Sequence, residues 1–256
     1  MLTWTDERLA ELPVKDDVRL RGLDMTRLET FCDAAFAFAV TLMVIAGGNL
    51  PDSFAALVEA LKDVPAFLAS FAAIGVIWIA HRRWSRRYGL EDGWTTLISL
   101  AMVFVMLVYI YPLRMVASAF MSYLSGGFLP TTFSFSGRSD LTGLFVIYGL
   151  GFAVQTVMLA LLYVRALRAA EQLRLNELEI FRTRCEVAAN LVLAATGLTS
   201  AVFAAVSPTS LGIWAGFAYM SLPIIMPILA KREEQGANRL RATMNRSSEA
   251  LVRRHP

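Results

Sequence analysis

The sequence predicts an all-α polytopic membrane protein with six transmembrane helices and with both the N and C termini in the cytoplasm. Of its 256 residues, 56% are hydrophobic, and the mean hydropathy of +0.53 is too high for a typical soluble domain. Apolar stretches long enough to cross a bilayer recur along the chain. Lys and Arg residues gather in alternate connections between these stretches, as the positive-inside rule requires.

The chain begins with a short polar segment, residues 1–26, which has no apolar core of the signal-peptide type. Thr26 and Glu29 have the spacing of a capping box and predict the start of the first helix. Pro51 and the glycines before it predict its end. We expect the six helices at residues 27–47, 64–82, 94–120, 141–165, 184–206 and 209–230.

The connections differ in character. Residues 52–63 are amphipathic and are expected at the membrane interface, whereas residues 121–140 are rich in turn-forming residues. Residues 166–183 are charged, have helical periodicity and are expected to extend a helix into the cytoplasm. The domain organisation that follows is a cytoplasmic N-terminal segment (1–26), a six-helix transmembrane domain (27–230) and a basic cytoplasmic tail (231–256).

The orientation comes from the basic residues. All but three of the 24 Lys and Arg residues lie in, or at the helix ends that adjoin, the N-terminal segment, the connections after the second and fourth helices, or the tail. The exceptions are Lys62, Arg114 and Arg138. Six spans with cytoplasmic termini explain this distribution. The arginine run at residues 82–87 is most simply a positive-inside signal that also suits anionic lipid, and the tail is most simply a solvated segment.

The first helix carries polar groups that a plain membrane anchor does not need, and such groups point to function because they are costly in lipid. Residues three or four apart share a helix face. One stripe therefore runs inward from the cytoplasmic mouth through Arg27, Phe31, Ala34, Phe38, Thr41 and Ile45. The stripe lines a narrow pore or packs against a neighbouring helix. Packing is the commoner case for a membrane helix taken alone, because intramembrane Thr usually bonds the carbonyl four residues back.

A longer motif favours the interpretation of the stripe as a pore lining. It consists of Arg27, three residues, Phe31-Cys32-Asp33, and then AFAFAVTL at residues 35–42. This motif resembles the first helix of the transmembrane protein 175 family, potassium channels of lysosomes and bacteria. The family pattern has serine where this chain has Cys32, and isoleucine or leucine where it has Phe38.

The resemblance implies a homotetramer of single six-helix units in a bacterial inner (plasma) membrane, with the first helix of each subunit around a central pore. It implies passive conduction of K+ through a hydrophobic constriction of the kind that gates by dewetting. The implied pore layers are Phe38, Thr41 and Ile45, with K+ held transiently near the Thr41 hydroxyls. Four phenyl rings at Phe38 close the pore, narrow it to protons, or offer ring faces to a cation.

The second helix carries a Trp-x-x-His pattern that the family also shows, formed here by Trp78 and His81. The resemblance implies that this pair contacts the first helix, and we expect a network that holds the first helix at the pore axis. Its members are Arg27, Phe31, Cys32, Asp33, Trp78 and His81. The simpler interpretation is an interfacial Trp, a His at a helix end, and polar groups solvated at the membrane surface.

Several other classes of function are not indicated. The sequence has no phosphate-cradling Gly loop, no nucleophile elbow and no carbonyl filter of the Thr-Val-Gly-Tyr-Gly type, so we expect neither an enzyme nor a nucleic-acid partner. Two cysteines and two histidines provide no metal-ligand cluster, and we expect free thiols and no cofactor. The main alternative is a proton-coupled secondary transporter or a proton-conducting pore. A third is a membrane scaffold without transport.

Overall fold

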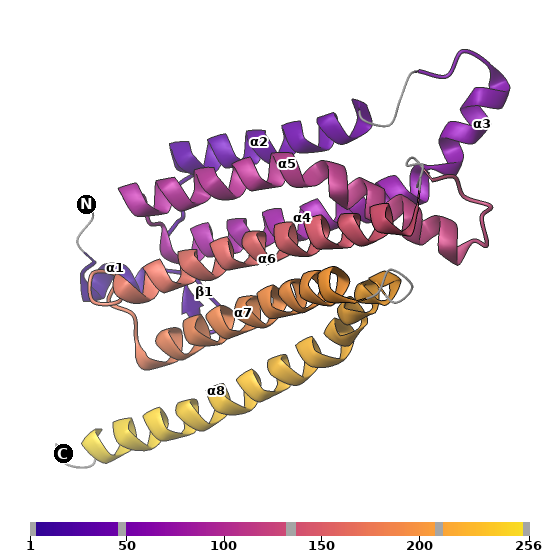
Figure 1. The fold of residues 1–256 in the computed structure, drawn as a ribbon. Coiled ribbons are helices and arrows are strands. Elements are labelled where there is room, and N and C mark those ends of the chain that lie inside the picture. The colour runs from indigo at the N-terminus through magenta and orange to yellow at the C-terminus, as the bar shows by residue number, and fades with distance from the viewer. Residues whose placement is uncertain (1–3, 46–49, 132–136, 208–211, 253–256) are drawn as a thin grey trace.

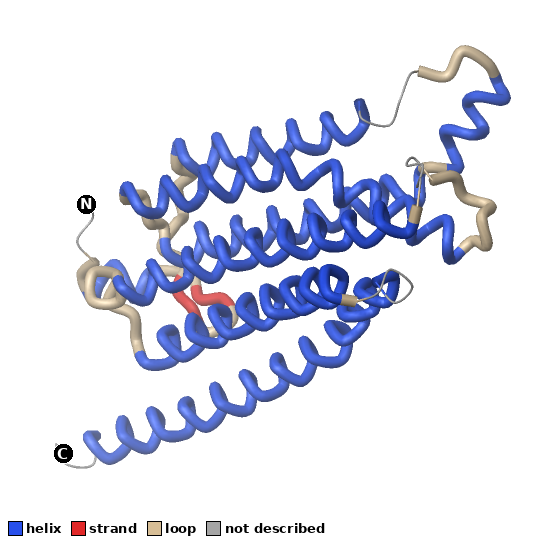
Figure 2. The backbone as a smooth tube through the Cα atoms, in the orientation of Figure 1, coloured by secondary structure: helices blue, strands red, loops and turns tan. Residues whose placement is uncertain are grey.

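The computed structural model describes residues 4–45, 50–131, 137–207 and 212–252. Within them, long helices form a bundle with one small β-hairpin beside it (Figures 1 and 2). In chain order the elements are α1 Asp6–Glu11, β1 Val14–Lys15, β2 Val18–Arg19, α2 Arg27–Ile45, α3 Phe54–Lys62, α4 Val64–Tyr88, α5 Gly93–Leu124, α6 Arg138–Arg168, α7 Glu177–Val206, the 3₁₀ helix η1 Gly212–Ser221 and α8 Leu222–Val252.

Six helical segments of the described chain are long and apolar enough to cross a membrane, which confirms the predicted number of spans. They are α2, α4, α5, α6, α7 and the segment from Trp214 to Arg246 in η1 and α8. Helix α1 and the end of α8 lie at the same end of the bundle (Figure 1), as an even number of spans requires.

The last spanning segment differs from its prediction. Helix α8 begins at Leu222 and continues to Val252, so the predicted end at residue 230 lies inside it. Pro227 lies within α8. Hydropathy does not detect this extension, because a helix that leaves the apolar layer continues wherever polar residues have good helix propensity. The predicted start of this helix, at residues 209–211, lies outside the described residues.

Other helix ends also lie beyond the apolar stretches. Helix α4 continues to Tyr88 and α5 to Leu124, and α7 begins at Glu177 with a capping box formed by Asn176 and Glu179. The predicted end of the first helix at residues 46–47 falls outside the described residues. The polar extensions of α4 and α7 contact the N-terminal segment of the chain.

Helices α6 and α7 approach each other closely along the bundle. A Cβ atom added to Gly149 would lie 2.6 Å from the Gly197 carbonyl oxygen, and one added to Gly197 would lie 2.7 Å from the Gly149 carbonyl oxygen. Membrane helices associate through such small-residue contacts because lipid provides little hydrophobic drive between them. This pair of glycines therefore fixes α7 against α6.

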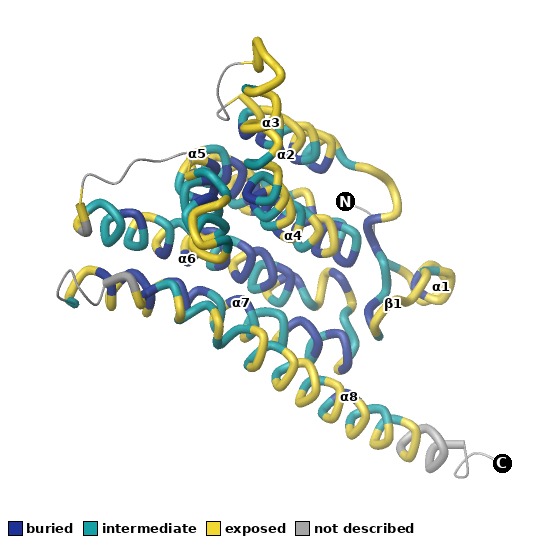
Figure 3. Tube along the Cα trace, turned by 90° about the vertical axis from the view of Figure 1, so that its right-hand side faces the viewer, coloured by how far each residue is buried: buried dark blue, intermediate teal, exposed yellow. Residues whose placement is uncertain are grey.

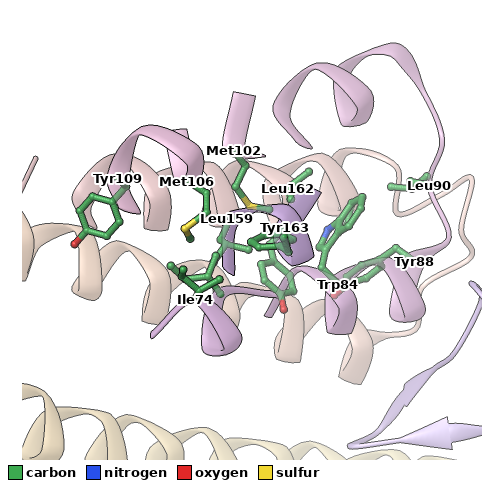
Figure 4. Packing of buried hydrophobic residues seen from close by; sticks show 14 of the residues in the cluster. Ile74, Trp84, Tyr88, Leu90, Met102, Met106, Tyr109, Leu159, Leu162 and Tyr163 are labelled. Atoms are coloured by element: carbon green, nitrogen blue, oxygen red, sulfur yellow. The ribbon is translucent and has the colours of Figure 1, made fainter. Parts of the chain in front are cut away.

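The core lies between α4, α5 and α6 and consists of large side chains (Figure 4). The Trp84 ring contacts that of Tyr88 in the same helix, α4. The Tyr88 ring in turn meets that of Tyr163 of α6 edge to face, with centroids 6.0 Å apart. Met102 and Met106 of α5 fill the remaining space as buried side chains. Helix α2 packs onto this core from outside, against α4 and α5.

A β-hairpin, which the sequence analysis does not predict, precedes α2. Strands β1 and β2 pair through a two-residue turn in which Asp16 and Asp17 have φ values of 52° and 64°. Aspartate tolerates this left-handed region better than most residues, and two-residue hairpins favour it. Val18 is fully buried, so the hairpin is a fixed part of the fold.

The arginine run after the apolar part of α4 binds this N-terminal segment. The Arg86 guanidinium donates to the carbonyl oxygens of Gly22 (2.9 Å) and Leu23 (2.6 Å). Arg87 donates to Glu186 (2.8 Å) of α7 and contacts Asp16 (3.4 Å). The interpretation of the run as a charge signal alone is therefore incomplete, because Arg83, Arg86 and Arg87 all bind other elements of the protein itself.

Part of the region predicted to be a solvated tail is bound to the bundle. Asp17 of the hairpin accepts hydrogen bonds from Arg182 of α7 and Arg241 of α8, and Arg182 also pairs with Glu233 (2.9 Å) and Glu234 (2.7 Å) of α8. Elsewhere much of α8 is exposed or half-buried (Figure 3). The expectation of a simply solvated segment is wrong for this part of α8.

Candidate functional site

Helix α2 has one buried and one exposed face. The buried face consists of Glu29, Cys32, Phe36, Ala39 and Met43. The exposed face contains the predicted stripe, in which the side chains of Phe31, Phe38 and Ile45 are 54%, 55% and 67% exposed. Thr41 is also exposed. A large apolar surface is thus left without a partner inside the protomer.

Thr41 lies between the two exposed apolar residues Phe38 and Ile45. Its hydroxyl donates to the Ala37 carbonyl oxygen at 3.2 Å. This is the bond to the carbonyl four residues back that the sequence predicts for a Thr in an apolar helix. The bond uses the hydroxyl hydrogen, so the oxygen lone pairs stay available to accept a hydrogen bond or to coordinate a cation.

The start of α2 is joined to α4 by a polar contact. The Trp78 indole Nε1–H donates to the Asp33 carboxylate at 2.7 Å, and the Arg82 guanidinium lies 5.4 Å from the centre of the Trp78 ring. A hydrogen bond to a charged group is stronger than a neutral one. Two members of the predicted network, Asp33 and Trp78, are therefore in direct contact.

His81 is directed into the core. It is 2% exposed, its Nε2 lies 3.2 Å from the Ser99 hydroxyl of α5, and its ring centre is 6.4 Å from that of Phe36. His81 thus contacts α2 through the Phe36 ring and α5 through Ser99. The sequence gives no signal for Ser99, since a single Ser in an apolar helix has many possible partners.

The remaining predicted members lie apart from this contact. Arg27 is exposed, and among the described residues it forms no ion pair with Asp33. Cys32 is fully buried, and both cysteines are free thiols. No group of His, Cys, Asp or Glu side chains in the described chain has the arrangement of a metal site. Neither metal nor disulfide chemistry is therefore indicated within this part of the chain.

An open groove of about 210 Å³ runs between α2 and α4 beside the exposed face. Its lining is almost entirely apolar, with the Asp33–Trp78 pair as the polar component. The lining residues are Asp33, Phe36, Ala37, Val40, Phe71, Ile74, Gly75 and Trp78. The groove is shaped by side chains of two spanning helices and suits another apolar surface better than a polar solute.

Six helical segments able to span a membrane in the described chain, an exposed apolar face with one hydroxyl, and a groove beside that face define a multi-pass membrane protein whose first spanning helix has one uncovered face. A sequence profile described as endosomal/lysosomal potassium channel TMEM175 matches residues 27–112. A curated relative, a potassium channel of Marivirga tractuosa, is 35% identical over 229 residues, which cover 86% of this chain and 92% of the relative.

Solved structures agree. A crystal structure of a variant of the potassium channel MtTMEM175 matches with a TM-score of 0.76 at 32% identity, over 88% of this chain and 100% of that one. A structure described as a homologue, from Chamaesiphon minutus, of the lysosomal potassium-selective channel TMEM175 matches with a TM-score of 0.51 at 20% identity, over 81% and 96% of the two chains. This second likeness concerns the fold alone.

The chain therefore belongs to the TMEM175 family, which confirms the resemblance of its first helix. The relatives named here are ion channels and not enzymes.

Proposed function

We propose that this chain is a potassium channel whose pore is lined by α2 of four identical subunits in a bacterial inner membrane. Its relatives in the family are named as potassium channels. The distribution of Lys and Arg residues supports cytoplasmic termini. With this orientation Arg27 lies at the cytoplasmic mouth and Ile45 lies further along the pore.

The observation that carries this proposal is the exposed face of α2. Phe38 and Ile45 are more than half exposed in the protomer although they lie on a helix whose other face is packed. Four copies of this face around an axis give two apolar rings with a ring of Thr41 hydroxyls between them. A hydrophobic constriction of this kind controls conduction by excluding water when it is narrow.

Thr41 is the residue proposed to contact K+. Its hydroxyl hydrogen is engaged by the Ala37 carbonyl, so the oxygen presents lone pairs to the passing ion. Four such oxygens replace part of the hydration shell, while Phe38 and Ile45 keep competing water out. The ring at Phe38 also offers its negative face to a cation, a favourable contact that an aliphatic side chain does not provide.

The groove between α2 and α4 supports the assembly. Its apolar lining lies next to the exposed face, where a neighbouring subunit with the same axis would pack its own α2. The Asp33–Trp78 hydrogen bond fixes the start of α2 against α4 and so sets the direction in which the exposed face points. Native mass spectrometry of the purified protein tests the stoichiometry, and any assembly other than four would contradict it.

The decisive experiment is a reversal potential, measured for the purified protein in a bilayer with K+ on one side and Na+ on the other. We expect a shift towards the potassium equilibrium potential. Current without such a shift would show a cation pore that Phe38 has made unselective. Current that follows a pH gradient instead would favour the proton-conducting alternative. The specific reason to consider this alternative is the bulk of the Phe38 ring, which narrows the pore. The absence of current would contradict the channel.

A further inference from the structure

Arg114 is a buried cation on the side of the bundle that is otherwise poor in cations. It lies in α5, is 6% exposed, and is one of the three basic residues that the charge distribution leaves on that side. An arginine in an apolar environment is costly and persists where its donors are used. Its partners therefore indicate its role.

The Arg114 guanidinium joins two other elements. One terminal nitrogen donates to the carbonyl oxygen of Met43 in the last turn of α2, and the other pairs with the Asp63 carboxylate at the start of α4. The ion pair offsets the charge of the buried guanidinium, and the hydrogen bond attaches α2 to α5.

The carboxylate of Asp63 is committed to this contact. Asp63 is the N-cap residue of α4, yet its side chain forms no capping hydrogen bond there. N-cap aspartates usually accept from the first turn of their own helix. Here the carboxylate is directed to Arg114 instead, so α2, α4 and α5 meet at one ion pair.

This contact lies at the opposite end of α2 from Asp33 and Trp78. Met43 is fully buried and is two residues from both Thr41 and Ile45, which face the other way. A hydrogen bond to its backbone therefore fixes the segment that carries two of the three pore layers, without touching the pore. The Asp33–Trp78 bond alone would leave this end of α2 without a polar attachment.

We propose that Arg114 is a positioning residue of the pore, which sets the diameter at Ile45 and Thr41 by tying the last turn of α2 to α4 and α5. The inference rests on the proposed channel function. It assigns Arg114 to ion selectivity although the side chain lies outside the conduction path.

The test uses Arg114→Gln and, as a matched control, Lys62→Gln. Lys62 is a cation at the same end of the bundle, adjacent to Asp63. Its ammonium group pairs with Glu59 on its own helix and lies 5.3 Å from the centre of the Phe128 ring, and neither contact involves α2. We expect Arg114→Gln to lower the K+/Na+ permeability ratio several-fold and to change single-channel conductance. Lys62→Gln should keep both at wild-type values. Single-channel conductance does not depend on how much protein folds, so reduced stability alone leaves it unchanged.

An Arg114→Gln protein that assembles normally and has wild-type conductance and permeability ratio would overturn the proposal. If this variant does not assemble, Arg114→Lys and Asp63→Asn replace it, because each keeps one part of the contact. Intermediate changes in both support the positioning role, and wild-type values in both overturn it. A wild-type protein that carries no K+ current would instead contradict the proposed function, so the two failures are distinguishable.

Discussion

The buried and exposed faces of α2 carry similar apolar side chains but have different partners. Phe36 lies on the buried face at 4% exposure, and Phe38, two residues further, lies on the other at 55%. Phe36 belongs to the buried core cluster with residues of α4 and α5, while more than half of Phe38 is exposed on the protomer surface. Hydropathy alone does not separate a face that stabilises the fold from one that is kept for another subunit or for ions.

The comparison also shows how a helix with an unpaired face is held in place. The exposed face is largely uncovered within the protomer, so the opposite face and the two ends of the helix supply most of its attachments. Phe36 packs against His81, Asp33 accepts from Trp78, and the Met43 carbonyl accepts from Arg114. A helix with one free face is thus held by contacts of its other face and of its ends, and mutations on the two sides should have different effects.

The largest effect is expected on the buried face. Replacing Phe36 by Ala should destabilise the protein by about 3–5 kcal/mol, because it leaves a cavity between α2, α4 and α5. Phe38→Ala removes the same atoms from the exposed face and should change stability by less than about 1 kcal/mol. Unfolding of the purified proteins in detergent micelles measures both. Equal losses of stability in the two variants would show that Phe38 is packed as well as Phe36.

On the exposed face the expected change is in conduction. Thr41→Ala should lower the K+/Na+ permeability ratio because it removes the oxygen ligands, and Phe38→Leu should raise conductance because the side chain is smaller. Thr196→Ala in α7 is the matched control, since the Thr196 hydroxyl also donates to the carbonyl four residues back, that of Val192 at 3.0 Å, but is buried. If Thr41→Ala and Phe38→Leu both preserve conductance and selectivity, the pore assignment is wrong.

A smaller effect is expected at the mouth. Trp78→Phe keeps the aromatic packing but removes the indole N–H, which leaves the Asp33 carboxylate without this donor. Hydrogen bonds to charged groups contribute about 1.5–3 kcal/mol, so we expect a loss of stability in this range. Trp94→Phe, at a residue 67% exposed, should be neutral in the same unfolding measurement. A neutral Trp78→Phe would mean that Asp33 is adequately solvated and that the bond does not hold α2.

The sequence predicts the spans and the stripe well because both depend on local periodicity. The alternation of Phe36 and Phe38 between two faces follows from helical spacing once the helix is placed. The residues that hold α2 and α4 in place from other helices do not follow from local spacing. Ser99 and Asp63 are far from α2 in sequence, and only the packing of whole helices brings them to His81 and Arg114.

The structure of the N-terminal segment is likewise not predictable from local spacing, because its contacts are with residues far along the chain. Its hairpin buries Val18, and its charges are satisfied by α4, α7 and α8. The Arg21–Glu179 ion pair is fully buried at 2.8 Å and joins residues that the sequence separates widely. Composition shows these residues only as polar and charged. Their role in fixing the chain before α2 depends on tertiary contacts.

The smallest effect on conduction is expected from Asp17 and its partners Arg182 and Arg241, which lie outside both faces of α2. Burial raises the pKa of Asp17, but hydrogen bonds from Arg241 and Arg182 outweigh it, and the pKa is lowered overall. A carboxyl with a lowered pKa in the folded protein adds stability above its unfolded pKa, about 3.9. That stability is lost as the pH falls through the folded pKa.

Asp17→Asn should therefore lower the unfolding temperature at neutral pH by a few degrees, and the difference from wild type should disappear as the pH falls through the lowered pKa of Asp17 in the folded protein. Thermal unfolding across this pH range measures it. The reversal potential at neutral pH should stay at its wild-type value, because Asp17 binds α7 and α8 and contacts no residue of the exposed face. A change in K+/Na+ selectivity would show that contacts of the N-terminal segment influence the position of α2. The orientation of the exposed face would then depend on these contacts as well as on those that α2 makes itself.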